Sequence, residues 1–257
     1  MEESKSYIDI SKLRNFDEIF SDTRTFFKAH WKLYFWLLLL YAGPFIAIAQ
    51  YMNAHVIENL MQTIETESIE IPEISMTTAL IQQLFAFAAN IVVNGVTLSF
   101  ITVYALRKEI THASVMEVFN KNLILFISAS LISDVILNLA FQLYIIPGLI
   151  LFIPLSFYVY DKLLHKSIFV ETFSRIFALT RSNLKLSIGT VVTTYAIFSI
   201  IAFICVIIPF ISTTPFIISG TIFLTLATII SGFIMVPIVL LYHTLYITTY
   251  NTPINVE

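Results

Sequence analysis

Cysteine, glycine and charged residues are scarce in this chain, and each scarcity excludes a class of protein. Cys205 is the only cysteine, so the chain forms no internal disulfide and no zinc site built from several cysteines. With only 6 glycines, it has no glycine-rich loop of the kind that cradles phosphates. Charged residues make up 12% of the chain, too few to cover the surface of a soluble domain of this length.

Apolar residues are abundant and occur in long runs. They make up 58% of the chain, and the mean hydropathy is +0.86. A helix needs about 20 apolar residues to cross a bilayer. Runs that meet this requirement, or nearly so, lie at 33–52, 79–106, 122–141, 144–160, 186–208 and 216–250. The sequence therefore predicts an all-α polytopic membrane protein with six transmembrane helices.

The spans divide the chain into a single integral membrane domain, 1–257. It begins with a cytoplasmic segment, 1–32, and continues as a six-span bundle, 33–250, with an outer loop at 53–78 and a short cytoplasmic tail at 251–257. Gly43-Pro44 predicts a kink in the first span. The last span exceeds the thickness of the hydrocarbon core, so we expect it to tilt, to project or to kink at Gly232 or Pro237.

Charge is segregated along the chain and predicts its orientation. All 14 lysines and arginines lie before the first span or in the gaps that follow the second and fourth spans. The outer loop instead has five glutamates, at 58, 65, 67, 70 and 73. Because basic segments stay in the cytoplasm, both termini are expected there.

One charged, aromatic phrase occurs twice. "FDEIFSDTRTFFKAHWKL" (16–33) and "FVETFSRIFALTRSNLKL" (169–186) align without a gap, 153 residues apart. Their apolar residues follow helical spacing, which is typical of amphipathic helices in the membrane interface. A weaker echo, "VMEVFNK", precedes the third span at 115–121. We therefore expect either two copies or three helical hairpins, each preceded by a cytoplasmic interfacial helix.

A family resemblance lies between Ile146 and Leu186. "IPG" at 146–148 and "ETFSRIFALTRSN" at 171–183 resemble a widespread bacterial group of six-helix inner-membrane proteins, which includes the membrane domain of some glycerophosphodiester phosphodiesterases. Ile176 departs from the pattern, because that group usually has a small polar residue there, and the acidic first loop is an addition. The opening, 16–44, is similar to membrane proteins of Bacteroidetes-type bacteria. The resemblance implies a six-helix fold in a bacterial inner membrane and no particular activity. The matching residues are Pro147, Gly148, Glu171, Leu179, Thr180 and Asn183.

Asp134 is the one ionisable residue well inside a predicted span. Such a residue costs about 2.5 to 3.5 kcal/mol on insertion scales, so it is expected to face the protein interior with a partner. Asn94 and Asn138 are candidate partners, and the three residues form a candidate intramembrane polar cluster. The cluster is either a proton or cation relay or a structural interhelical hydrogen bond; a single acid favours the structural role.

The basic segments favour anionic lipid headgroups, and nucleic acid is not an expected partner of a bilayer-bound loop. The histidines lack metal-ligand spacing, and no serine or threonine has a neighbouring base, so neither a metal site, a cofactor nor an enzyme activity is predicted. The cations expected to contact lipid are Arg24, Lys28, Lys32, Arg175, Arg181 and Lys185.

These observations predict a non-enzymatic scaffold or assembly partner in a membrane complex. Its contact surfaces would be the interfacial helices or the outer loop 53–78, against lipids or a membrane-protein partner. The alternative is a transporter or lipid-handling protein with a polar cavity near Asp134 and Asn94.

Overall fold

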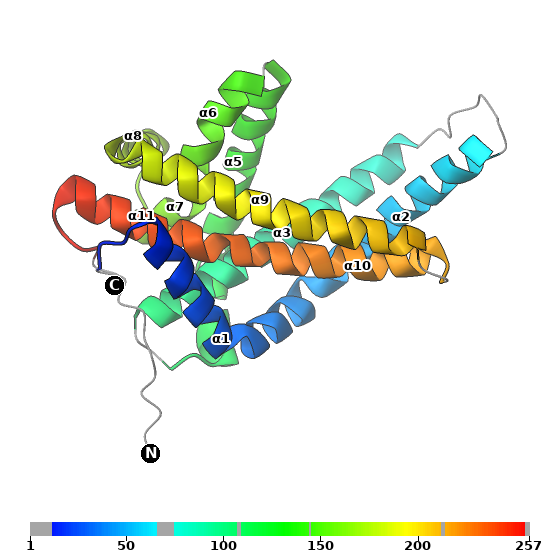
Figure 1. Ribbon diagram of the computed structural model, residues 1–257, viewed down its shortest axis with the longest axis horizontal. Coiled ribbons are helices and arrows are strands. Elements are labelled where there is room, and N and C mark those ends of the chain that lie inside the picture. Colours follow the sequence, from blue (N-terminus) through cyan, green and yellow to red (C-terminus); the bar gives the residue numbers. More distant parts are fainter. Residues whose placement is uncertain (1–11, 66–74, 107–108, 144, 212–213, 255–257) are drawn as a thin grey trace. The chain divides into compact units, whose positions relative to one another are not determined.

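A computed structural model describes residues 12–65, 75–106, 109–143, 145–211 and 214–254, and every element in these ranges is helical (Figure 1). The elements are α1 (Phe16–Tyr41), α2 (Gly43–Glu65), α3 (Met76–Ala105), α4 (His112–Lys121), α5 (Leu123–Leu143), α6 (Ile145–Leu155), α7 (Tyr158–His165), α8 (Phe169–Ser182), α9 (Leu184–Ile211), α10 (Phe216–Ser231), the short 3-10 helix η1 (Gly232–Ile234) and α11 (Met235–Tyr250). The expectation of an all-α protein is therefore confirmed for the described residues.

Several of these helices are long and apolar enough to cross a membrane. Within the described residues there are four such segments, and five if the bent pair α1 and α2 counts as one span. The four are Met76–Ala105, Leu123–Gln142, Leu184–Ile211 and Phe216–Tyr250. Five of the six predicted spans thus have a helical counterpart, and the described chain has four or five helical segments that could cross a membrane.

The first predicted span is bent where the sequence places Gly43-Pro44. α1 and α2 meet at Ala42 with an angle of 64° between them. Pro44 has no N–H to donate, and its ring is tolerated because it lies in the first turn of α2. The backbone hydrogen bonds resume on both sides, from Ala42 N to Leu38 O and from Ile46 N to Ala42 O. The predicted kink is confirmed.

The predicted fourth span, 144–160, is not one continuous helix. α6 ends at Leu155, residues 156 and 157 form a turn, and α7 begins at Tyr158. With 11 residues, α6 is about 16 Å long, short of a hydrocarbon core of about 30 Å. Pro154 lies inside α6 just before the break; it has no N–H for the carbonyl four residues earlier, and its ring crowds that carbonyl, which weakens the end of α6.

The described chain forms two compact units, and three long helices contribute to both. Unit 1 comprises residues 1–34, 94–195 and 234–257, and unit 2 comprises 35–93 and 196–233. In unit 2, α10 packs along α2, and Gly220 lies against Ala54. In unit 1, α5 packs against α6 and α7, while α8 packs against α6, α7 and α11.

Two of the three predicted interfacial helices are separate helices in the structure, and one is not. The second copy forms a separate helix, α8, and the weaker echo forms α4, which Thr111 and Ser114 begin with a reciprocal capping box. The first copy does not form a separate helix: it is continuous with the first apolar run as α1. Asn15 and Glu18 bond each other's backbone N–H at 2.9 Å, which fixes the start of α1 at Phe16.

The two copies turn equivalent positions inward. Ile19, Thr23 and Phe26 are buried in α1, and their counterparts 153 residues later, Thr172, Ile176 and Leu179, are buried in α8. Ile19, Thr23 and Ile176 belong to the apolar stripe that the helical spacing predicts, whereas Phe16 and Phe169, at the start of the same stripe, are exposed. Each phrase therefore packs on protein through its buried residues, while the first phenylalanine of each copy keeps an exposed side.

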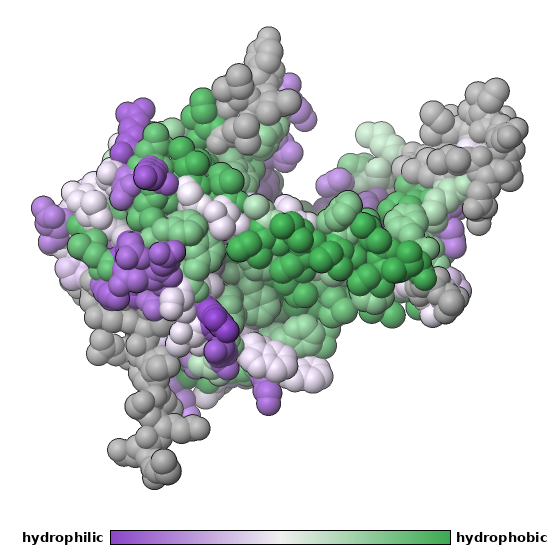
Figure 2. All heavy atoms as spheres, viewed as in Figure 1, coloured by the Kyte–Doolittle hydropathy of each residue, from purple (hydrophilic) through white to green (hydrophobic). Residues whose placement is uncertain are grey.

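The surfaces of the long helices are strongly apolar. Figure 2 shows hydrophobic residues over the visible surface of α9, where Val192, Ile200 and Phe203 are more than half exposed. In water such a surface would drive association, whereas lipid tails solvate it. This surface agrees with a membrane location for α9.

The core of unit 1 is aromatic and closely packed around α3. Phe26 contacts the ring edges of Phe100 and Tyr104, with centroids 5.7 and 5.1 Å apart. The fully buried Tyr34 hydroxyl lies 2.6 Å from Thr97 Oγ1. At Gly95 there is no room for a side chain, since a Cβ would lie 2.5 Å from the Phe119 ring.

This close approach makes Gly95 a test of the packing of unit 1. Phe119 is buried and stacked on Phe126, so it has little room to yield. Although alanine favours helix, we expect Gly95→Ala to lower the free energy of unfolding by about 1 to 3 kcal/mol. The matched control is Gly189→Ala, whose Cβ would be 3.7 Å from the nearest ring, and it should be neutral or stabilising. Thermal unfolding in detergent measures both; equal stability of the two variants would contradict the packing.

Candidate functional site

A fully buried carboxylate, Asp161, is the centre of the most extensive polar cluster in unit 1. Asp161 lies on α7 and has no exposed surface. Arg175 of α8 donates to both of its oxygens, from Nε to Oδ1 at 2.7 Å and from Nη2 to Oδ2 at 2.9 Å. This two-pronged geometry is the strongest pairing that an arginine makes with a carboxylate. Hydrogen bonding to Asp161 raises the pKa of Arg175 above its usual range.

A third helix contributes to the same carboxylate. The Tyr242 hydroxyl of α11 donates to Asp161 Oδ1 at 2.5 Å, and Tyr242 is fully buried. An unpaired charge is very unfavourable in the protein interior, whereas a paired and hydrogen-bonded one is tolerated. Asp161 therefore connects α7, α8 and α11, and we call Asp161, Arg175 and Tyr242 the carboxylate clamp.

The turn between α7 and α8 is fastened to the clamp. Arg175 Nη2 also donates to Ser167 Oγ at 2.5 Å, and Ser167 Oγ lies 2.9 Å from the Thr172 hydroxyl. Lys162 Nζ donates to the main-chain carbonyl of Ser167. α7 ends at Lys166, whose φ of 49° is in the left-handed region. These bonds hold a turn whose backbone a non-glycine residue rarely adopts.

Two histidines flank the clamp. Tyr160 of α7 and His243 of α11 are buried, and the Tyr160 hydroxyl lies 2.7 Å from His243 Nε2. His165 stacks on Tyr246, with ring centroids 5.5 Å apart, and its buried Nε2 has no hydrogen-bond partner within the described residues. Burial lowers the pKa of His165, and the positive charge of Arg175 lowers it further. His165 is therefore neutral at pH 7.

The arrangement is suited to holding helices together and not to acid–base chemistry. Both oxygens of Asp161 accept hydrogen bonds, and no part of its surface is open to a substrate. A general base must reach the proton that it removes, which this carboxylate cannot do in the observed packing. No group of three or more metal-ligating side chains occurs among the residues that the structure describes.

The predicted intramembrane cluster of Asp134, Asn94 and Asn138 lies on α3 and α5, on other helices than the clamp. Asp134 is half-buried on α5, Asn94 is half-buried on α3, and Asn138 is exposed. The Asn138 amide donates to the main-chain carbonyl of Asp134 at 2.9 Å, within α5 itself. At least one hydrogen bond of the Asn138 side chain is therefore made within α5.

The six cations expected to contact lipid divide into two groups. Arg175 points inward and is bound in the clamp, so it is not available to a headgroup. The other five are exposed on α1, α8 and α9: Arg24, Lys28, Lys32, Arg181 and Lys185.

The clamp was not predicted from the sequence. Asp161 follows an apolar run among other charges, as a solvated residue at a helix end would, and Tyr242 reads as part of an interfacial stripe with Tyr246 and Tyr250. In the structure Tyr242 is buried, while Tyr250 is exposed. The available signal was that Asp161 directly follows the apolar, aromatic stretch Tyr158–Tyr160 in "YVYDKLLH", whose inward-facing side chains would bury it.

Comparison with protein-family models, curated proteins and solved structures found no match to this chain. The resemblance to six-helix bacterial inner-membrane proteins therefore stays a prediction. Three of its residues have structural roles: Leu179 and Thr180 are buried in α8, and Asn183 ends α8 and accepts a hydrogen bond from Leu186 N through its side chain at 3.1 Å. Ile176, the departure from the pattern, is fully buried in α8.

The clamp predicts a specific pattern of stability. Asp161→Asn leaves the largely buried Arg175 without a counter-charge, so we expect a loss of about 3 to 5 kcal/mol in the free energy of unfolding. Tyr242→Phe removes one hydrogen bond and should cost about 1 to 3 kcal/mol. The double variant Asp161→Leu with Arg175→Met removes both charges and should recover most of the loss. Unfolding in lipid nanodiscs measures all three; a double variant less stable than Asp161→Asn would argue against the clamp.

His165 predicts a pH dependence. A histidine whose pKa is lowered on folding favours the folded state when neutral. Its contribution is therefore complete above its ordinary pKa of 6.5 and is lost as the pH falls below that value. Acidification from pH 7.5 to 5 should lower the melting temperature of the wild type more than that of His165→Phe, which keeps the ring stacked on Tyr246. Parallel slopes for the two proteins would show that His165 titrates normally.

Proposed function

We propose that this chain is a non-enzymatic scaffold or assembly partner in a bacterial inner membrane. The observation that supports this most is the internal pairing of the clamp: both oxygens of the fully buried Asp161 accept hydrogen bonds from Arg175, and one of them also accepts a hydrogen bond from Tyr242. A protein built for proton transfer or hydrolysis needs an acid or base that can reach its substrate. A scaffold needs fixed surfaces, and the clamp provides three helices held in one arrangement.

The orientation follows from the charge distribution. With positive residues inside, both termini, the clamp and α8 lie at the cytoplasmic face, and the acidic segment 53–78 lies outside. The first part of this acidic segment, as far as Glu65, belongs to α2, while residues 66–74 lie outside the described residues. The burial of Ile19 and its counterpart Thr172, and of Phe26 and its counterpart Leu179, supports repeated units in which an amphipathic segment precedes each helical hairpin.

α8 offers the best-defined contact surface. Its inward face is fixed by Ile176 and Leu179, while Phe169, Phe173 and Phe177 form a ladder of rings 5.3 and 5.1 Å apart along the helix. Val170, beside this ladder, is 68% exposed. Aromatic residues at this spacing suit either the membrane interface or the groove of a neighbouring helix.

Site-specific photo-crosslinking in the native membrane tests the scaffold. A benzophenone residue at Val170 should give a discrete protein adduct of constant mass, because the exposed side of α8 faces a partner. The control position is Phe203 on α9, which is equally exposed but should meet lipid tails and give no protein adduct. Adducts with lipid alone at both positions would contradict an assembly role.

The transport alternative predicts a different measurement. If Asp134 were a proton relay, reconstituted vesicles should collapse an imposed pH gradient faster than empty vesicles, and Asp134→Asn should abolish the difference. We expect equal rates for the wild type, Asp134→Asn and empty vesicles. A proton flux that depends on Asp134 would replace the scaffold by a transporter.

A further inference from the structure

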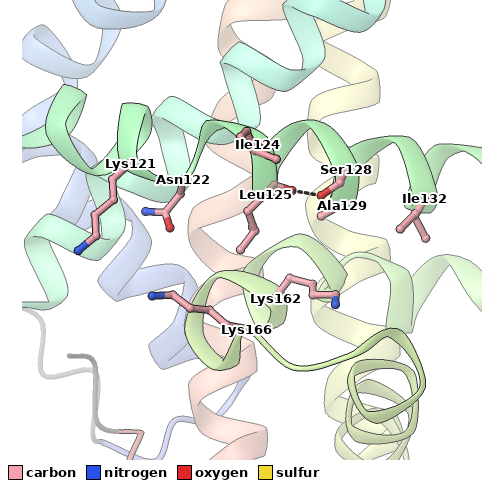
Figure 3. Close-up of a pocket in the computed structure, with 9 residues that line it drawn as sticks. All are labelled: Lys121, Asn122, Ile124, Leu125, Ser128, Ala129, Ile132, Lys162 and Lys166. Atoms are coloured by element: carbon pink, nitrogen blue, oxygen red, sulfur yellow. Dashed lines mark hydrogen bonds between the residues drawn. The ribbon is translucent and has the colours of Figure 1, made fainter.

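A pocket of about 470 Å³ lies in unit 1 between the beginning of α5 and α7 (Figure 3). Lys121 and Asn122 line it where α4 gives way to α5, and Lys162 and Lys166 line it from α7 across the pocket. Ile124 and Ile132 belong to the wall formed by α5. The pocket is separate from the clamp and from the predicted Asp134 cluster.

The pocket has a strong positive charge without a compensating acid. None of its lining residues is acidic, and its three lysines form no ion pair within the described residues. Lys162 Nζ donates one hydrogen bond to the main-chain carbonyl of Ser167. In Figure 3, Lys121 and Lys166 extend toward the same end of the pocket and Lys162 toward the other. Lys121 and Lys166 thus direct two positive charges toward one end of the pocket, where a bound anion would reduce their repulsion.

The carboxylate clamp sets the position of the two lysines of α7. Asp161 turns one side of α7 into the protein, so Lys162 and Lys166, one helical turn apart, line the pocket. Lys166 also has the left-handed backbone that ends α7, with φ at 49°. A left-handed residue is a common way to end a helix, and here it fixes where the chain leaves α7.

The wall formed by α5 is apolar and leads toward the membrane. α5 is a candidate span that begins at Leu123, so Lys121 and Asn122 lie at its cytoplasmic end, where lipid headgroups are expected. Ile124 is 83% exposed, and Ile132 lies eight residues further along the helix, about 12 Å deeper. The pocket is thus basic at the interface and apolar along the path that acyl chains take.

We propose that this pocket binds the headgroup of an anionic phospholipid, with its acyl chains lying along α5. Basic pockets at the cytoplasmic ends of membrane helices are suited to such headgroups. Three lysines match a lipid with two phosphates better than one with a single phosphate, so affinity should decrease from cardiolipin to phosphatidylglycerol to phosphatidylcholine. This inference does not depend on the scaffold function, because it concerns a site that a transporter could equally possess.

Native mass spectrometry of the full-length protein, titrated in detergent with each of these three lipids, tests the proposal. Lys121→Gln and Lys166→Gln should each weaken cardiolipin binding about fivefold, and the double variant about 30-fold. Phosphatidylcholine binding should not change. The control double variant is Lys121→Arg with Lys166→Arg, which changes the same two side chains but keeps both charges and should keep the wild-type affinity.

A second pair of variants separates charge from folding. Lys166→Arg keeps the cation and should keep binding. Lys166→Gly removes the cation but suits the left-handed backbone, so it should lose about fivefold in affinity without a lower melting temperature. Equal cardiolipin binding by the pocket and control double variants would overturn the proposal. So would competition by glycerol 1-phosphate at the same concentration as the lipid, because that result would assign the pocket to a soluble phosphate.

Discussion

A carboxylate without solvent must be compensated on every side, and the arrangement of unit 1 follows from how Asp161 meets that requirement. Arg175 supplies the opposite charge and two aligned donors, and Tyr242 supplies a third. Each partner comes from a different helix, so the three helices have little freedom to rotate or slide without leaving a buried charge unpaired. This constraint is directional, which sets it apart from the apolar packing that surrounds it.

The constraint has consequences on the outer surfaces of the same helices. On α7, turning Asp161 inward leaves Lys162 and Lys166 to line the basic pocket. On α8, turning Arg175 toward α7 is consistent with burial of Ile176 and leaves Phe169 exposed. The interior ion pair therefore positions both the candidate lipid site and the candidate contact surface, although it belongs to neither. Such coupling gives a membrane protein fixed recognition surfaces without a large soluble domain.

Two arginines on the same helix have different roles for this reason. Arg175 and Arg181 lie six residues apart on one short helix, yet Arg175 is bound to Asp161 and Arg181 is exposed. The difference depends only on which face of α8 meets α7. A positive charge near a membrane is attracted to lipid by default, but a buried carboxylate competes more strongly, because its charge is not screened by water.

The sequence by itself determined the all-α class, five of the predicted apolar segments as helical candidate spans and the bend at Gly43-Pro44. These features depend on local composition and on the covalent limits of proline, which act wherever the chain lies. Only the tertiary structure decided that Asp161 is buried against Arg175 and Tyr242, and that Arg175 is withdrawn from the lipid-facing cations. Those outcomes depend on residues up to 81 positions apart, and a linear pattern does not show which side chains will meet.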